Sequence, residues 1–392
     1  MRDRIDYFGI YFITFIGMSF FFLLPAVVVD IDGKIIAFLL GCVGVFSYLV
    51  GYKTKKYFKI NILSFPNYIG YCARAILVYY LFIITVTLTS TVEVGSYTEG
   101  YANVNHFLLY TKILTVFFDI LIYYVLSNYV GDNKKRYYLV AILSVLVNLK
   151  SNTRLDLLLP VIFWAGYGYY FNIIKVTFIR VFIVLLFTPV LFTALLLRRV
   201  MKGSFESYFE QIQIIYDYLS FDNLLQNIYV SMETFRSYEL FIKIVDDGFI
   251  HIESGFLRIA FMFIPRSIWV DKPESVSRII SHHFYPEQYD GGGGTVANIF
   301  GDAYINGGVI GIILVLFFWG WITKVIYNST IERLPSFDND IQTKSFLISV
   351  YLVYVQESIQ YYRGFMSESF WRLLYFITIT ILLSKILKKK DS

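Results

Sequence analysis

Apolar stretches of roughly 17 to 25 residues recur along most of this chain, and each is long enough to cross the hydrocarbon core of a bilayer. Inside lipid, a spanning segment can satisfy its backbone polar groups only as a helix or as part of a closed barrel. Barrel strands would appear as short segments in which apolar and polar residues alternate, and these runs show no such alternation. The pattern therefore predicts a bundle of membrane-spanning helices.

Composition supports the same interpretation. The 392 residues are 57% hydrophobic and only 16% charged, with a mean hydropathy of +0.60. In soluble domains about a quarter of residues are charged. The sequence therefore predicts an all-α integral membrane protein and excludes an ordinary soluble domain.

The apolar runs mark about ten transmembrane helices. We place them at 8–29, 35–52, 69–91, 112–129, 137–149, 155–173, 176–197, 303–327, 345–362 and 370–387. This division gives an N-terminal membrane bundle over 1–197, one large loop over 198–302 and a C-terminal membrane segment over 303–392.

The orientation follows from the tendency of short cytoplasmic loops to retain Lys and Arg. With the N-terminus inside, the cytoplasmic segments are "MRDR", "KTKKYFK", "GDNKKR", the link around Lys175, "IERLPSFDNDIQTK" and "KILKKKDS". The opposite links "DIDGK" and "EVGSYTEGYANVNHF" are poor in basic residues. We therefore expect both termini in the cytoplasm and the large loop on the outer, periplasmic side.

The net charge of +5 is mostly this inner-side signature and indicates no nucleic-acid partner. The two cysteines, Cys42 and Cys72, fall inside predicted spans and have neither a disulfide pattern nor metal-ligand spacing. The sequence predicts no metal site and no cofactor. In the loop, "FESYFEQIQIIYDYL" at 205–219 has the spacing of an amphipathic helix, which would lie in the membrane interface or pack on the bundle.

Titratable side chains gather at the outer ends of the predicted spans and in the loop beside them. Positive charge is disfavoured in short outer loops, and charges near a bilayer usually mark a substrate path or site. Because the planar Arg fork matches phosphate oxygens, this pattern predicts a site for a phosphorylated ligand. The candidate residues are Arg154, Arg198, Arg199, Arg266, Lys272, Arg278, His282, His283, Asp302 and Arg363.

Three short segments carry a family resemblance. "IPRSIWVDKP", a Gly-rich link followed by "GDAYINGGVIG", and the mid-chain "SNTRLD" resemble the Wzy-type O-antigen and oligosaccharide repeat-unit polymerases, as does the order of spans and loop. The resemblance implies a GT-C-type glycosyltransferase of the bacterial inner membrane. Its substrates would be undecaprenyl-pyrophosphate-linked oligosaccharides, with membrane lipids and a chain-length regulator protein as further partners.

That chemistry assigns a role to each candidate. Departure of a lipid pyrophosphate needs positive charge beside the leaving group to stabilise its negative charge, and Arg154, Arg266, Lys272 and Arg363 can supply it without a metal ion. The acceptor hydroxyl needs a base, and His282 or His283 suits this role, with Asp302 as the competing candidate. We count Arg154 and Arg266 with the possible bases as catalytic residues. The expected substrate-binding residues are Lys272, Arg278, Arg363, Arg198 and Arg199.

Each assignment has a structural alternative. Arg154 could bond Asp156, and Arg266 could pair with Asp271 or Glu274. Arg198 and Arg199 could be interfacial anchors, and loop histidines are commonly inert. Two other functions remain as alternatives. An O-antigen ligase would share the same chemistry. A flippase or transporter would be expected to show related halves and polar groups near the midplane, whereas here the strongest polar groups collect at the outer ends of the spans.

Overall fold

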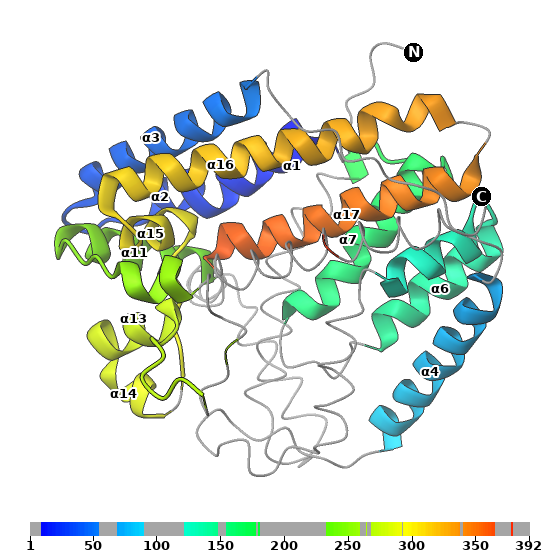
Figure 1. Ribbon diagram of the computed structural model, residues 1–392, viewed down its shortest axis with the longest axis horizontal. Helices are drawn as coiled ribbons and strands as arrows, with labels where there is room; N and C mark the ends of the chain where they lie inside the picture. The colour runs from blue at the N-terminus through cyan, green and yellow to red at the C-terminus, as the bar shows by residue number, and fades with distance from the viewer. Residues whose placement is uncertain are drawn as a thin grey trace.

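The computed structural model describes residues 9–54, 69–89, 121–147, 154–177, 179–180, 233–258, 264, 268–291, 293–337, 340–364 and 378. Within these ranges every regular element is a helix and no strand is present, which confirms the predicted all-α class (Figure 1). Long apolar helices lie side by side, and shorter helices cluster at one end of them.

The long helices coincide with predicted spans. The first is interrupted and runs as α1 (Ile10–Met18), the π-helical turn η1 (Ser19–Leu23) and α2 (Leu24–Val28). The others are α3 (Lys34–Lys53), α4 (Ile69–Thr89), α6 (Lys134–Leu146), α7 (Arg154–Tyr170), α16 (Gly308–Ser329) and α17 (Ile341–Arg363). The predicted spans 176–197 and 370–387 lie almost wholly outside the described residues.

Two of these helical segments are long and apolar enough, by length and composition, to cross a membrane. They are Lys34–Lys53 and Gly308–Ser336. Shorter apolar helices cover Ile13–Val28, Tyr71–Thr85 and Leu121–Val130.

α3 and α16 run parallel and pack against each other along most of their length (Figure 1). Glycines allow this close approach, since a Cβ added to Gly51 would lie 2.0 Å from the Phe317 carbonyl oxygen, and one added to Gly320 would lie 2.1 Å from that of Tyr48. Small residues at such crossings let helix backbones meet, as membrane helix pairs often do. The α3–α16 pair is therefore packed backbone to backbone.

α7 and α17 run antiparallel and are joined by side-chain hydrogen bonds. The Tyr167 hydroxyl bonds the Ser345 hydroxyl at 3.0 Å, and the Gln356 amide donates to the Leu159 carbonyl. Tyr167 also donates to the carbonyls of Ser127 and Gly131, which connects this pair to the segment before α6. Buried hydroxyls and amides thus bond across helices whose other facing side chains are apolar.

The predicted start of the eighth span is wrong by several residues. We expected a continuous helix from 303, but residues Ile299–Ile305 form a separate short helix, α15, and α16 begins at Gly308. The break falls at "NGG", where Gly308 has a φ of +61°, a conformation that glycine adopts readily. Asp302 consequently lies on α15, ahead of the long helix.

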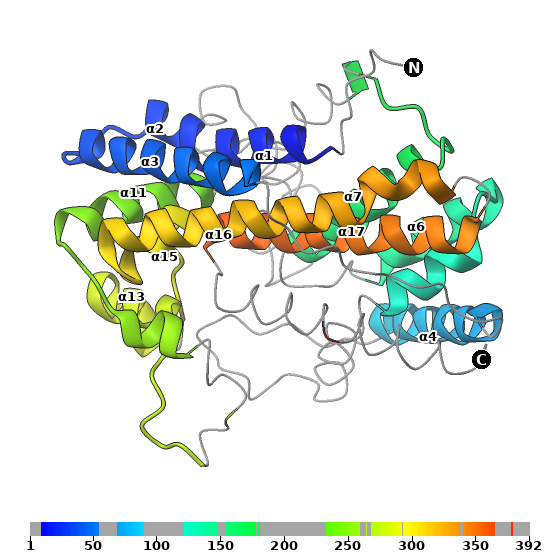
Figure 2. The same cartoon turned by 45° about the horizontal axis from the view of Figure 1, so that its top comes forward.

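The two ends of the bundle differ. One end, here the basic end, carries Lys53, Lys134, Lys135, Arg136 and Lys344. The opposite end, here the loop end, holds the short helices of the predicted loop, at the start of α3 and the end of α17 (Figures 1 and 2). These are α11 (Glu233–Asp246), the π-helical turn η3 (Glu253–Leu257), α13 (Val276–Phe284), α14 (Pro286–Asp290) and α15. The amphipathic stretch predicted at 205–219 lies outside the described residues.

Candidate functional site at the loop end

Asp302 lies in the first turn of α15 and is 2% exposed. Asn298 caps this helix, because its side-chain oxygen accepts from the backbone N–H groups of Phe300 (3.1 Å) and Gly301 (3.0 Å). The Asn306 amide donates to the Asp302 carbonyl at 2.7 Å and to its carboxylate at 3.3 Å. The carboxylate is therefore mostly desolvated and accepts a hydrogen bond from a neighbouring amide.

Arg363 is brought to the same place by the end of α17. Gly364 ends that helix with a φ of +105°, and a Cβ added there would lie 1.5 Å from the Ala297 carbonyl oxygen. Only glycine fits a backbone that approaches this closely and takes this conformation. The last residue of α17 thus meets the segment that leads into Asn298 and α15, so that Arg363 and Asp302 belong to neighbouring elements.

Arg154 begins α7 at this end of the bundle. Leu159 is bonded by Gln356 of the antiparallel α17. Arg154 lies five residues before Leu159, which is about 7.5 Å along a helix at 1.5 Å per residue. Its backbone is therefore roughly level with the last turn of α17, although its side chain lies outside the described residues.

The two candidate histidines lie exposed on α13. The His282 ring meets the Tyr289 ring edge-on, with centroids 4.7 Å apart. His283 stacks on Phe249 at 4.6 Å, and its Nε2 is 3.4 Å from the Asp247 carboxylate. Both imidazoles are accessible to solvent, unlike Asp302, and each already contacts a neighbouring side chain.

Arg278 holds its own surroundings together. Its guanidinium lies 4.0 Å from the Tyr289 ring centroid and donates to the carbonyls of Tyr289 (3.0 Å) and Gly293 (3.2 Å). Its Nε is 3.9 Å from the Glu274 carboxylate. These contacts fasten α14 and the Gly-rich link to α13, which favours the structural role for Arg278 over ligand binding.

Lys272 also bonds within the loop, because its ammonium group donates to the Ile264 carbonyl at 2.8 Å. The other predicted cations, Arg198, Arg199 and Arg266, lie outside the described residues. The structure therefore brings Asp302, Arg363 and the start of α7 to one end of the bundle, with α13 and its histidines nearby. Among the described residues, no group of three or more His, Cys, Asp and Glu side chains is arranged to hold a metal ion.

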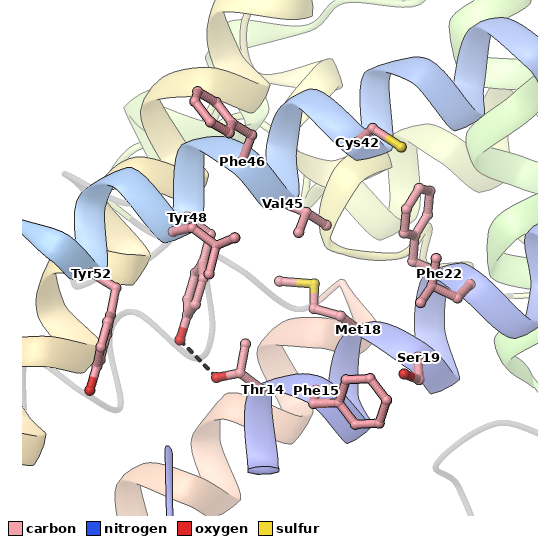
Figure 3. A pocket seen from close by; sticks show the side chains of 12 residues that line it. Thr14, Phe15, Met18, Ser19, Phe22, Cys42, Val45, Phe46, Tyr48 and Tyr52 are labelled. Atoms are coloured by element: carbon pink, nitrogen blue, oxygen red, sulfur yellow. Dashed lines mark hydrogen bonds between the residues drawn. The ribbon is translucent and has the colours of Figure 1, made fainter. Parts of the chain in front are cut away.

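A groove lies between the first helix and α3 (Figure 3). This groove has a volume of about 420 Å³ and is almost wholly apolar. Its one described hydrogen bond joins the hydroxyls of Thr14 and Tyr48 at 2.9 Å. The lining residues are Thr14, Phe15, Met18, Ser19, Phe22, Leu23, Cys42, Val45, Phe46, Tyr48, Leu49 and Tyr52. Sequence reasoning missed it, since antiparallel pairing of the first two apolar runs does not show where their side chains leave a space.

Sequence reasoning also missed Asn298 and Thr234, which bond the first helix from the loop end. Pro25, inside the first apolar run, was the available signal, because a proline in a spanning helix frees carbonyls that need other donors.

Comparison of the chain with protein-family models, with curated proteins and with solved structures finds no match.

Proposed function

We propose that this chain is a membrane-embedded glycosyltransferase that polymerises lipid-linked oligosaccharide repeat units, as its resemblance to the Wzy-type polymerases implies. The observation that carries the proposal is the placing of Asp302 and Arg363 on neighbouring elements at the loop end, with the backbone of Arg154 about level with the last turn of α17. This transfer requires a carboxylate or other base that can accept a proton, and arginines that can hold a pyrophosphate.

The helix directions support the alternation of the predicted spans. α3 and α16 would be the second and eighth spans, and they run parallel, as two even-numbered spans must. α7 and α17 would be the sixth and ninth, and they run antiparallel, as an even and an odd span must. The basic end would face the cytoplasm of a bacterium, and the loop end the periplasm.

In the proposed reaction, Arg154 and Arg363 hold the pyrophosphate of the donor while its bond to the sugar breaks. Arg266 and Lys272 of the loop would complete the cationic surroundings. The acceptor hydroxyl gives its proton to a side chain of the loop end as it attacks. The buried and fixed carboxylate of Asp302 favours it as that base, and His282 and His283 are the exposed alternatives.

The apolar groove supports a lipid-linked substrate. It lies between two apolar helices that would stand in the hydrocarbon layer, and its flanks expose Phe15 and Phe46. Cys42 to Tyr52 extends about 15 Å along α3 at 1.5 Å per residue, which is about half the thickness of a bilayer core. These residues belong to the half of α3 nearer the basic end, so a hydrocarbon chain in the groove whose polar head group stays at the loop end would also run along the first half of α3.

The test is deletion of the gene, followed by gel separation of the surface polysaccharide. We expect the ladder of chain lengths to collapse to a single capped repeat, and plasmid-borne wild-type protein to restore it. Complete loss of surface glycan would instead point to a ligase or a flippase. Purified protein should also lengthen lipid-linked repeat units without other proteins, and failure of this reaction would refute the proposal.

A further inference from the structure

The first helix is interrupted directly before Pro25. In the π-helical turn η1, the backbone N–H of Leu24 donates to the carbonyl of Ser19, five residues earlier. Pro25 has no N–H, so the residues four and five positions before it, Phe21 and Phe20, have no backbone donor at position 25. Two carbonyls are thereby freed inside an apolar helix, where each needs another partner.

The loop end supplies both partners. The Thr234 hydroxyl of α11 donates to the Phe20 carbonyl at 2.8 Å, and the Asn298 amide donates to the Phe21 carbonyl at 3.3 Å. Both donors are buried, at 2% and 0% exposed, and they lie 214 and 277 positions away in the chain. The widened turn is thus the attachment point of the loop end on the first helix.

Asn298 does more than satisfy one carbonyl, because the other atom of the same amide caps α15. Its oxygen accepts from the N–H groups of Phe300 and Gly301, and its own backbone N–H points to the Ser237 carbonyl of α11 at 3.4 Å. One side chain therefore joins the first helix to the first turn of α15. That turn carries Asp302, four residues after Asn298.

The choice of asparagine is informative. Serine and aspartate cap helices about as well as asparagine does. An ionised aspartate has no donor, and serine has one hydroxyl group in place of the separate oxygen and NH₂ group of asparagine. The cap alone does not require asparagine, whereas the bond to Phe21 does.

We propose that Asn298 is a positioning residue, which sets the place of Asp302 by tethering the start of α15 to the proline-freed carbonyl of Phe21. This inference rests on the proposed function for its kinetic consequence. Misplacement of a reacting group by about 1 Å can lower a rate roughly 100-fold. Loss of the tether should therefore lower turnover while the lipid donor still binds.

The main variant is Asn298→Asp, which keeps the capping oxygen and the size of the side chain but loses the amide donor. Asn298→Ser is the neutral second variant. We expect either to lower turnover about 100-fold with little change in KM for the donor lipid. The matched control is Thr234→Val, which removes the other bond to the same turn without touching α15, and it should cost much less turnover. Equal losses in the Thr234 and Asn298 variants would contradict the proposal.

Pro25→Ala separates positioning from simple satisfaction of a carbonyl, since it restores a backbone N–H that can bond Phe21. In the double variant with Asn298→Asp, hydrogen exchange of residues 19–24 should return to the wild-type rate. Turnover should stay low, because α15 is still untethered. Recovery of turnover together with exchange would show that Asn298 only satisfies the carbonyl and would overturn the proposal.

The exchange measurement also distinguishes this inference from the proposed function. Asn298→Asp should speed exchange in residues 19–24 and 299–305 together, whether or not the protein polymerises glycans. An inactive wild-type protein with this linked response would refute the function and leave the tether standing. Unchanged exchange in 299–305, or full turnover in both Asn298 variants, would overturn the tether itself.

Discussion

The helix caps at the basic end and at the loop end differ in how far their side chains reach along the chain. At the basic end, Asn133 caps α6 by accepting from the backbone N–H groups of Lys135 and Arg136, and Asp340 caps α17 by accepting from that of Thr343. All these partners are within three residues. At the loop end, Asn298 reaches across 277 positions to the first helix.

This difference in reach predicts different results when the capping residues are substituted. A local cap stabilises the end of its own helix, so its loss should lower stability and leave the arrangement of helices unchanged. A long-range bond fixes one element relative to another, so its loss should alter geometry at whatever site those elements form. We therefore expect activity to be sensitive at the loop end and only stability to be sensitive at the basic end.

The largest expected difference between the two ends is in their reaction with a thiol reagent added outside the cell. In a background with Cys42 and Cys72 replaced by Ala, Glu287→Cys at the exposed loop end should react fully with a membrane-impermeant thiol reagent in intact spheroplasts. Lys135→Cys at the exposed basic end should react only after the membrane is opened. The reverse pattern would invert the proposed orientation, and reaction of both in intact cells would contradict a membrane between the ends.

The next largest effect concerns the proposed base. Asp302→Asn keeps the shape of the side chain but removes its charge and its ability to accept the proton, so we expect turnover to fall roughly 100-fold to 10,000-fold. Asp340→Asn is the matched control at the basic end and should leave turnover unchanged. Polymerisation assays of purified protein with lipid-linked repeat units measure both. If Asp302→Asn stays active while His282→Ala or His283→Ala does not, the base is a histidine.

The apolar runs predicted where the long described helices lie, because a long run of apolar residues favours a helix. Its errors arose where backbone geometry decides the structure. The break at "NGG" was missed because Asn306 and two glycines interrupt an otherwise apolar pattern only briefly, and hydropathy averaged over a window does not register it. The π-helical turn before Pro25 was missed for the same reason.

The residue types of the candidate site and their gathering at one end of the bundle could be predicted from the sequence, but their contacts could not. Charge pattern placed Asp302 and Arg363 on the outer side, and both do lie at the loop end. The pattern could not show that Arg278 bonds the backbone carbonyls of Tyr289 and Gly293, because every residue has a backbone carbonyl and the sequence does not show which ones lie within reach. The role of Asn298 depends on a contact between distant segments that no local pattern encodes.

A smaller effect is expected for Arg278, whose described bonds lie within the short helices and links of the loop end and do not reach the long helices of the bundle. Arg278→Lys keeps the charge but cannot donate to the Tyr289 and Gly293 carbonyls in the same fixed geometry. We expect faster protease cleavage in the link at 289–294 and a modest loss of turnover. Arg136→Lys serves as the control at the basic end, because the Arg136 guanidinium likewise lies over a tyrosine ring and donates to a backbone carbonyl, both of Tyr129. Normal protease resistance with a large loss of turnover would return Arg278 to the list of substrate contacts.

The smallest effect is expected for the cap of α17 at the basic end. Asp340→Ala removes an acceptor from the Thr343 backbone N–H at 3.0 Å, and loss of such a cap typically costs about 1 kcal/mol of the free energy of unfolding. Thermal unfolding in detergent should show this loss, with turnover at the assay temperature unchanged. A large loss of turnover without a loss of stability would break the distinction between the two ends.

The same cap has a pH dependence of known sign. Burial raises the pKa of the Asp340 carboxyl, but its hydrogen bonds with the Thr343 side chain and with the backbone N–H groups of Thr343 and Gln342 outweigh burial and hold the pKa below the ordinary 3.8. Because the folded pKa is lower than the unfolded one, the ionised carboxylate contributes stability above 3.8, and this contribution is lost as the pH falls through the folded value. The stability difference between wild type and Asp340→Ala should therefore shrink on acidification below 3.8. Asn caps helices without a charge, so the difference between Asp340→Asn and Asp340→Ala should stay constant over the same range, and a wild-type advantage that also stays constant would show that the charge of Asp340 adds nothing to the cap.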